Sequence, residues 1–220
     1  MSRFGRRAGI RVALAALVAV AAVVGLWWKP WQSVNLPQSA CWGILSKDDL
    51  KPLAGADGTA VARISASTVV STLKSGPDQG VLPNAQCAVW WNQNRTLLSI
   101  NVDPQSAAGM QAEEDPRSLT QAPVNLGSGV VLLWQQDAVF VYFRCEGITW
   151  TGSPYAEVQV DGGPFAPYRQ AEGHASKSEM NAYANIALKV SRAVAKQVPC
   201  ANTLTFPQSA PTPKPAPSGS

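Results

Sequence analysis

The sequence predicts an α+β protein with an N-terminal transmembrane helix and one folded domain, which has an antiparallel sheet, a short N-terminal helix and a long C-terminal helix. Three observations predict this class. An uncharged apolar run occupies residues 12–28, pairs of apolar segments joined by short polar turns follow it, and a long amphipathic segment ends just before Cys200.

The apolar run, residues 12–28, reads VALAALVAVAAVVGLWW. As a helix it would extend roughly 25 Å, near the lower limit for spanning a bilayer. Four arginines precede the run, whereas only Lys29 is basic between it and Lys47. Basic flanks stay in the cytoplasm, so we expect a cytoplasmic N-terminus and an extracytoplasmic domain in a single-pass protein of the cell membrane.

An export signal has a shorter apolar core, about 7 to 15 residues, with small residues at the cleavage site. Here the small residues 19–21 lie inside the run, and Cys41 is too far beyond it for lipidation. We therefore favour an uncleaved signal anchor over a cleaved signal. Four residues suit the headgroup region as membrane-interface anchors: Trp27, Trp28, Lys29 and Trp31.

The formal net charge of +4 does not indicate nucleic-acid binding. Four of the 18 basic residues precede the apolar run, which leaves 14 basic and 14 acidic residues beyond its start. A nucleic-acid-binding protein would carry its basic residues on the folded part. The expected partners are the lipid bilayer and an envelope protein or a glycan, with no nucleic acid.

The chain divides into five expected segments. Residues 1–11 form a basic cytoplasmic segment, 12–28 the anchor, 29–40 a linker, 41–206 the extracytoplasmic α+β domain, and 207–220 a disordered proline-rich tail.

The first half of the domain should contain a short helix and a hairpin. Ser46 and Asp49 match a helix-start pair, and the following Pro52 and Gly55 limit the helix to one or two turns. Residues 59–74 are rich in β-branched residues and strand-like. Two apolar runs, 86–91 and 96–103, flank a polar turn and predict a hairpin.

Asp103 and Pro104 then predict the start of a short helix that ends before Pro116. A second hairpin is expected from residues 128–135 and 138–145, whose nearly continuous apolar runs suit central strands.

Residues 155–160 alternate as another strand. Ser176 and Glu179 form a capping-box match at the start of the last element, a helix of about 20 residues with one apolar face.

The four cysteines favour two disulfides if the domain lies outside the cytoplasm. Three pairings are possible. We favour Cys41 with Cys87 and Cys145 with Cys200, each closing a loop of about fifty residues. A zinc site is disfavoured because no C-x-x-C occurs and His174 is the single histidine.

The order of a membrane signal, a linker, CWGILSKDDLKPLAG, CAVWWNQNRTLLSINVD and an alanine-rich helix ending in cysteine resembles uncharacterised exported or anchored proteins of actinobacteria. It is loosely similar to their cysteine-containing lipoproteins of unknown function, but it lacks a lipidation cysteine. The resemblance implies α+β architecture, disulfides and a cell-envelope location. It implies no catalytic residues.

No catalytic signature is present. His174 stands near Glu172 and Ser176, but no G-x-S-x-G motif accompanies it. The glycine-rich segments lack the Lys-Ser/Thr of a phosphate loop, and we expect no catalytic residues, cofactor or metal.

The aromatic residues are the remaining functional candidates, as a stacking surface for a glycan or an apolar ligand. They are Trp42, Trp90, Trp91, Trp134, Trp150, Tyr155, Phe165 and Tyr168. Trp90 and Trp91 are adjacent on a strand, so they should face opposite ways. We select Trp150, Tyr155 and Trp91 as binding residues.

We therefore expect a non-enzymatic envelope protein that binds a ligand or a partner. A cell-envelope hydrolase using His174 and a structural subunit of a membrane assembly are the alternatives.

Overall fold

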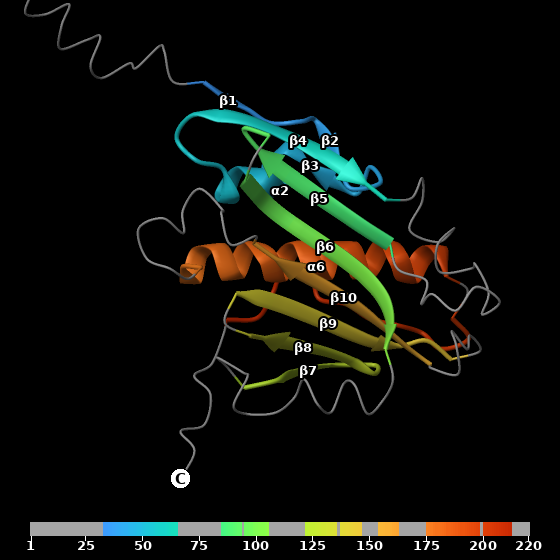
Figure 1. Ribbon diagram of the computed structural model, residues 1–220. Coiled ribbons are helices and arrows are strands. Elements are labelled where there is room, and N and C mark those ends of the chain that lie inside the picture. Colours follow the sequence, from blue (N-terminus) through green and yellow to red (C-terminus); the bar gives the residue numbers. More distant parts are fainter. Residues whose placement is uncertain are drawn as a thin grey trace, which may run out of the picture.

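The computed structural model describes residues 33–65, 85–93, 95–105, 122–135, 137–146, 154–162, 175–198 and 200–212. This part of the chain has an eight-stranded sheet, a two-stranded sheet, a long C-terminal helix and a short helix (Figure 1). The predicted α+β class and both helices are confirmed. The predicted anchor lies outside the described residues, and none of the helices within them has the length and hydrophobicity needed to cross a membrane.

The large sheet has its strands in this spatial order: β1 (Val34–Asn35), β4 (Gly58–Ile64), β5 (Ala85–Trp91), β6 (Arg95–Gln105), β10 (Tyr155–Asp161), β9 (Ala138–Arg144), β8 (Val130–Trp134) and β7 (Val124–Gly127). The small sheet pairs β2 (Ser39–Ala40) with β3 (Leu45–Ser46). The helical elements are α2 (Lys47–Leu50), the 3-10 turn η1 (Lys51–Leu53) and α6 (Lys177–Gln197).

The large sheet is mixed, which corrects the prediction of an antiparallel sheet. Strand β1 runs parallel to β4, whereas the other neighbours pair antiparallel. The parallel pair is continued by two contacts of Ser33: its carbonyl accepts from the Gly58 N–H at 3.0 Å, and its own N–H donates to Asp57 Oδ1 at 3.1 Å. A strand of only two residues has no periodic signal that the sequence could reveal.

Both hairpins form where the sequence predicts them. Asn92 and Gln93 adopt positive φ angles of 50° and 64° in the turn between β5 and β6. At the other hairpin, the Gln135 N–H donates to the Ala138 carbonyl at 2.9 Å and closes the connection from β8 to β9. The strand over 155–160 is confirmed as β10. The described part of the strand-like segment 59–74 forms β4, and residues 66–74 lie outside the described residues.

The predicted helix start at Asp103 and Pro104 is wrong, because both residues belong to β6. The rest of that predicted helix, from residue 106, lies outside the described residues. Asp103 pairs with Glu157 and Pro104 with Ala156 of β10. Pairing of β6 with β5 reaches only as far as Val102, so among the described residues Pro104 has a sheet partner in β10 alone. A proline is tolerated more readily at such an edge position than in a central strand, because it cannot donate to the ladder.

Helix α6 lies across one face of the sheet and packs against β9 and β10 (Figure 1). Its start is the predicted capping box: the Ser176 N–H donates to Glu179 Oε2 at 2.6 Å, and the Glu179 N–H donates to Ser176 Oγ at 3.3 Å. The predicted apolar face is buried, with Tyr183 and Val190 fully covered.

The folded part extends beyond both ends of the predicted domain, 41–206. Leu36 and Ala40, in the predicted linker, are buried in the core. In the predicted tail, the Ala210 N–H donates to Asn185 Oδ1 at 2.7 Å, so residues 207–212 run along α6.

Candidate functional site

Two disulfides hold the described part of the chain together, and disulfide bonding is confirmed. They join Cys41 to Cys87 and Cys145 to Cys200, the pairing that the sequence favours. The first ties the turn between β2 and β3 to β5. The second ties the end of β9 to the segment after α6.

The three aromatic residues selected from the sequence do not meet in one patch. Trp91 pairs with Arg95 at one end of β6, whereas Tyr155 pairs with Gln105 at the other end. At about 3.3 Å per residue, the two positions lie roughly 33 Å apart along the strand. Trp150 lies outside the described residues.

The two adjacent tryptophans have different surroundings, in line with opposite facing. Trp91 is only 2% exposed and belongs to the core. Trp90 is half-buried, and the Arg63 guanidinium lies over its ring, 5.7 Å from the centroid. Trp90 therefore has an accessible ring in a cation–π contact, while Trp91 offers at most an edge to a ligand.

Trp91 is one of the residues that line a pocket of about 350 Å³. The Trp91 pocket, as we call it, is lined by residues 54–57, Leu53, Trp91, Asn92, Arg95 and Glu179. Its volume lies within the range of small-molecule sites, about 300 to 1,000 Å³. Of the three residues selected from the sequence, Trp91 contributes to this pocket.

Gly58, the first residue of β4, packs against two residues that line the pocket, Trp91 and Asn92. Its φ angle is +144°, and a Cβ atom there would lie 2.7 Å from Trp91 Cε2 and 2.6 Å from Asn92 Oδ1. Only glycine allows the indole to pack this closely against the backbone. Asn92 is fixed in turn, since its Oδ1 accepts from the Thr59 N–H at 2.9 Å.

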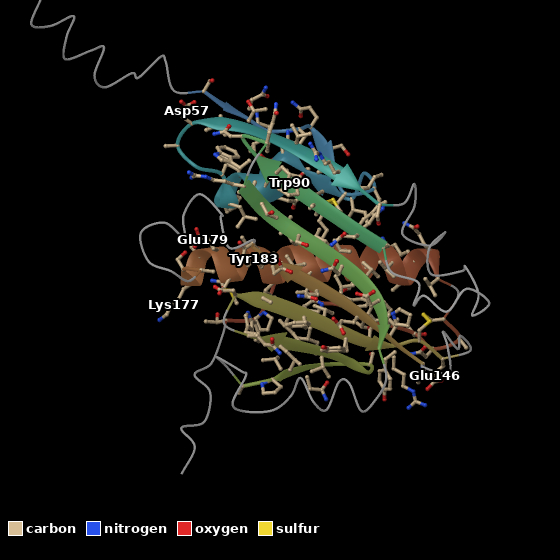
Figure 2. All side chains as sticks on the ribbon, viewed as in Figure 1. Asp57, Trp90, Glu146, Lys177, Glu179 and Tyr183 are labelled. Carbon is tan, nitrogen blue, oxygen red and sulfur yellow. A yellow bond between two sulfur atoms is a disulfide. The ribbon has the colours of Figure 1, made fainter. Side chains whose placement is uncertain are left out.

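The charged groups of the pocket come from three elements. Asp57 precedes β4, Arg95 begins β6, and Glu179 lies in the first turn of α6; Figure 2 shows Asp57 and Glu179 on the same side of the molecule. Asp57 is exposed and Glu179 is buried, and one oxygen of each accepts a backbone N–H. The pocket thus combines two carboxylates, a guanidinium and an amide, so it offers both acceptors and donors.

Sequence reasoning selected Trp91 but missed its polar neighbours. Glu179 was identified only as a helix cap, and Asp57, Asn92 and Arg95 carried no signal because they are distant in sequence or ordinary turn residues. His174 lies outside the described residues. Across the described part of the chain, no group of three metal-binding side chains could hold a metal ion.

Comparison with protein-family models, with curated proteins and with solved structures finds no match to this chain.

Proposed function

We propose that the protein is a non-enzymatic envelope protein that binds a small hydroxylated ligand, of the sugar class, in the Trp91 pocket. The observation that carries this proposal is the mixture of hydrogen-bonding groups around one indole edge. Sugar hydroxyls both donate and accept, and their ring C–H groups contact apolar surface.

The individual roles follow from the side chains. Arg95 and the Asn92 amide nitrogen donate, whereas Asp57 and Glu179 accept. Leu53 and the Trp91 edge supply the apolar wall. A pocket of one charge sign would favour an ion instead, but two carboxylates and one guanidinium leave no strong excess of either sign.

The cellular location is part of the same proposal. Residues 12–28 would anchor the chain in the membrane, with Arg3, Arg6, Arg7 and Arg11 inside and the domain outside. The two disulfides support an oxidising compartment for the domain. The pocket would then face ligands of the cell envelope.

Binding is tested with the full-length protein in lipid nanodiscs, by saturation-transfer NMR with glucose as the probe. We expect saturation transfer to glucose, and Arg95→Met should weaken it about tenfold through loss of charge-assisted donors. Arg63→Met removes an arginine outside the pocket and is the matched control. Equal effects of the two variants, or binding of glycine in preference to glucose, would contradict the sugar class.

Location is tested separately in cells. The full-length chain should stay with membranes after carbonate extraction. Protease added outside the cell membrane should remove the domain and spare a tag placed before residue 12. Recovery of the intact chain in the soluble fraction would contradict the anchor.

A further inference from the structure

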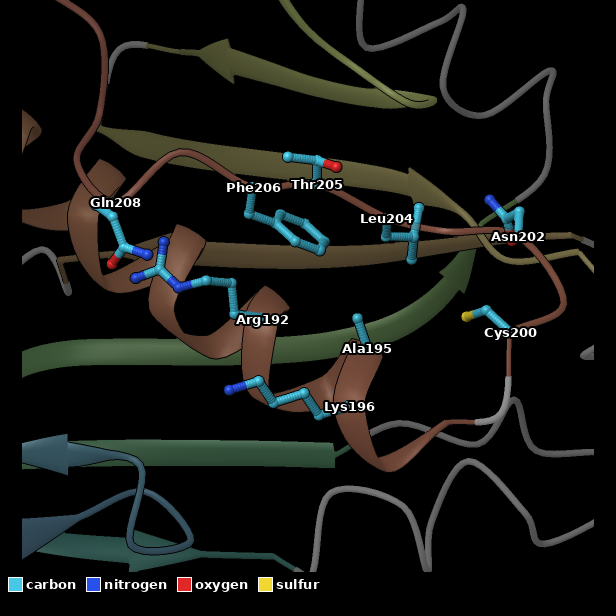
Figure 3. A pocket seen from close by; sticks show the side chains of 9 residues that line it. All are labelled: Arg192, Ala195, Lys196, Cys200, Asn202, Leu204, Thr205, Phe206 and Gln208. Carbon is cyan, nitrogen blue, oxygen red and sulfur yellow. The ribbon is translucent and has the colours of Figure 1, made fainter.

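A second hollow lies at the other end of α6, between the helix and the segment that follows it. We call residues 200–210 the C-terminal strap. The basic pocket is the space between Arg192, Ala195 and Lys196 of α6 and Asn202, Leu204 and Phe206 of the strap (Figure 3). Its volume is about 380 Å³. Arg192 lies 13 positions after Glu179, so roughly 20 Å of helix separates this pocket from the Trp91 pocket.

The strap is held firmly at its start. The disulfide Cys145–Cys200 joins it to the end of β9. Asn202 then accepts from the Glu146 N–H and donates to the Arg144 carbonyl, both at 2.7 Å. These bonds fix the orientation of the Asn202 side chain, which forms a wall of the pocket.

The far end of the strap is also fixed. Phe206 packs its ring edge-on against Phe143, with centroids 5.6 Å apart. Arg192 Nη1 donates to the Pro207 carbonyl. That bond uses one of the five guanidinium N–H groups, which leaves donors for a ligand. The walls are therefore preformed, which lowers the entropy cost of binding.

The charge of the basic pocket has one sign. Arg192 and Lys196 are one helical turn apart, and none of the nine residues that line the pocket is acidic. Glu146, whose backbone holds the strap, directs its carboxylate to Arg144 at 3.7 Å. The C-terminal end of a helix carries about half a negative charge, which is less than the two positive charges here.

Burial lowers the pKa of the Arg192 guanidinium, as expected for a partly buried cation that has no carboxylate beside it within the described ranges. An anion in the pocket would compensate this cost. Part of the remaining lining is apolar, because Ala195, Leu204 and Phe206 contribute hydrocarbon surface, while Asn202, Thr205 and Gln208 are polar. A fully hydrated anion such as phosphate would gain nothing from that surface.

We infer that the basic pocket binds a small carboxylate with an apolar body, whose carboxylate contacts Arg192 and Lys196 and whose hydrocarbon part packs on Leu204 and Phe206. Arginine suits this role because its planar fork matches a carboxylate. The pocket volume accommodates a group the size of one aromatic ring.

The experiment uses the full-length protein in nanodiscs of zwitterionic lipid, with benzoate and its neutral isostere benzamide as probes in saturation-transfer NMR. Benzoate should bind at least about tenfold more tightly than benzamide, because only benzoate makes charge-assisted bonds. Lys196→Gln should weaken benzoate binding about fivefold and leave benzamide unchanged. Raising the salt concentration should reduce the difference between the probes.

Lys177→Gln is the matched control, since it removes the same charge from the exposed first turn of the same helix. Arg192→Gln removes the guanidinium charge and should also weaken benzoate binding, with circular dichroism to confirm that the fold is retained. Equal binding of the two probes, no binding of benzoate, benzoate binding that is insensitive to Lys196→Gln, or a preference for inorganic phosphate would each overturn the inference.

Discussion

Lys189 Nζ lies 2.6 Å from Asp49 Oδ2, and this contact joins the long helix α6 to the short helix α2 across 140 positions of sequence. The same Asp49 oxygen accepts from the Ser46 N–H at 2.6 Å and from Ser46 Oγ at 2.7 Å. One carboxylate therefore caps α2 and holds it against α6.

Asp49→Ala should lower the free energy of unfolding by about 1–2 kcal/mol, because it removes the cap and the ion pair together. Lys189→Met removes only the pair, which is partly exposed, and should cost about 0.5 kcal/mol. Thermal unfolding followed by circular dichroism measures both. The control is Asp48→Ala, an exposed neighbour, which should change little; a loss for Lys189→Met as large as for Asp49→Ala would contradict the capping role.

Asp49 should also make stability depend on pH. Burial raises the pKa of Asp49, but the hydrogen bonds from Lys189 and Ser46 lower it by more, so the pKa lies below the ordinary value. Asp49 therefore adds to the free energy of unfolding at pH values above its pKa in the unfolded chain, about 3.9. This stabilisation is lost as the pH falls through the lower pKa of the folded protein. The stability difference between wild type and Asp49→Asn should therefore narrow as the pH falls below 3.9 in unfolding titrations.

Asp103 should have the opposite effect on stability, which it should lower as the pH rises. Burial raises the pKa of its carboxyl, which faces Glu157 across the strands β6 and β10. Stability is therefore highest, as far as Asp103 is concerned, below about pH 3.9, the pKa of this group in the unfolded chain. Stability falls as the pH rises through the raised pKa of Asp103 in the folded protein. Asp103→Asn should thus be more stable than wild type at pH 7 and equal to it at pH 3. Equal stability at both pH values would contradict the effect of burial.

Gly58→Ala should destabilise the protein by about 1–3 kcal/mol and alter the Trp91 pocket. Its φ angle disfavours any side chain, and the new Cβ would meet the Trp91 ring and Asn92. Gly127→Ala is the matched control, since Gly127 also has a positive φ, +85°, but nothing lies within 4 Å of its Cβ position. Equal losses of stability for the two variants would show that the backbone angle alone matters, and the packing argument would fail.

Removing either disulfide should cost about 4 kcal/mol in the chain-entropy model, because the cysteines are 46 and 55 positions apart. The double variants Cys41→Ala/Cys87→Ala and Cys145→Ala/Cys200→Ala measure each bond. The second should also loosen the start of the C-terminal strap and weaken benzoate binding. Peptide mapping without reductant checks the pairing, and free thiols throughout would contradict it.

Local signals predicted much of the fold. The capping boxes at Ser46 and Ser176 and the polar turn after Trp91 each act within a few residues, and the structure contains both capping boxes and a turn at Asn92 and Gln93. The favoured cysteine pairing also rests on these local signals, because each pair joins two elements that the sequence patterns predict.

Long-range pairing overruled a local signal at Asp103 and Pro104. Alone, these residues favour the start of a helix. In the structure β10 supplies a partner strand for the whole of β6, including Asp103 opposite Glu157. The continued ladder and the burial of the sheet outweigh one cap, which contributes only about 1 kcal/mol.

The sequence by itself determined which segments are apolar, where the hairpins turn and where the long helix begins, because these depend on neighbours along the chain. Only the tertiary structure decided that β1 lies parallel to β4, that Trp91 and Tyr155 stand at opposite ends of β6, and that Arg192 and Lys196 line one pocket together with the strap. These arrangements depend on which distant segments become buried together, and no short stretch of sequence contains that information.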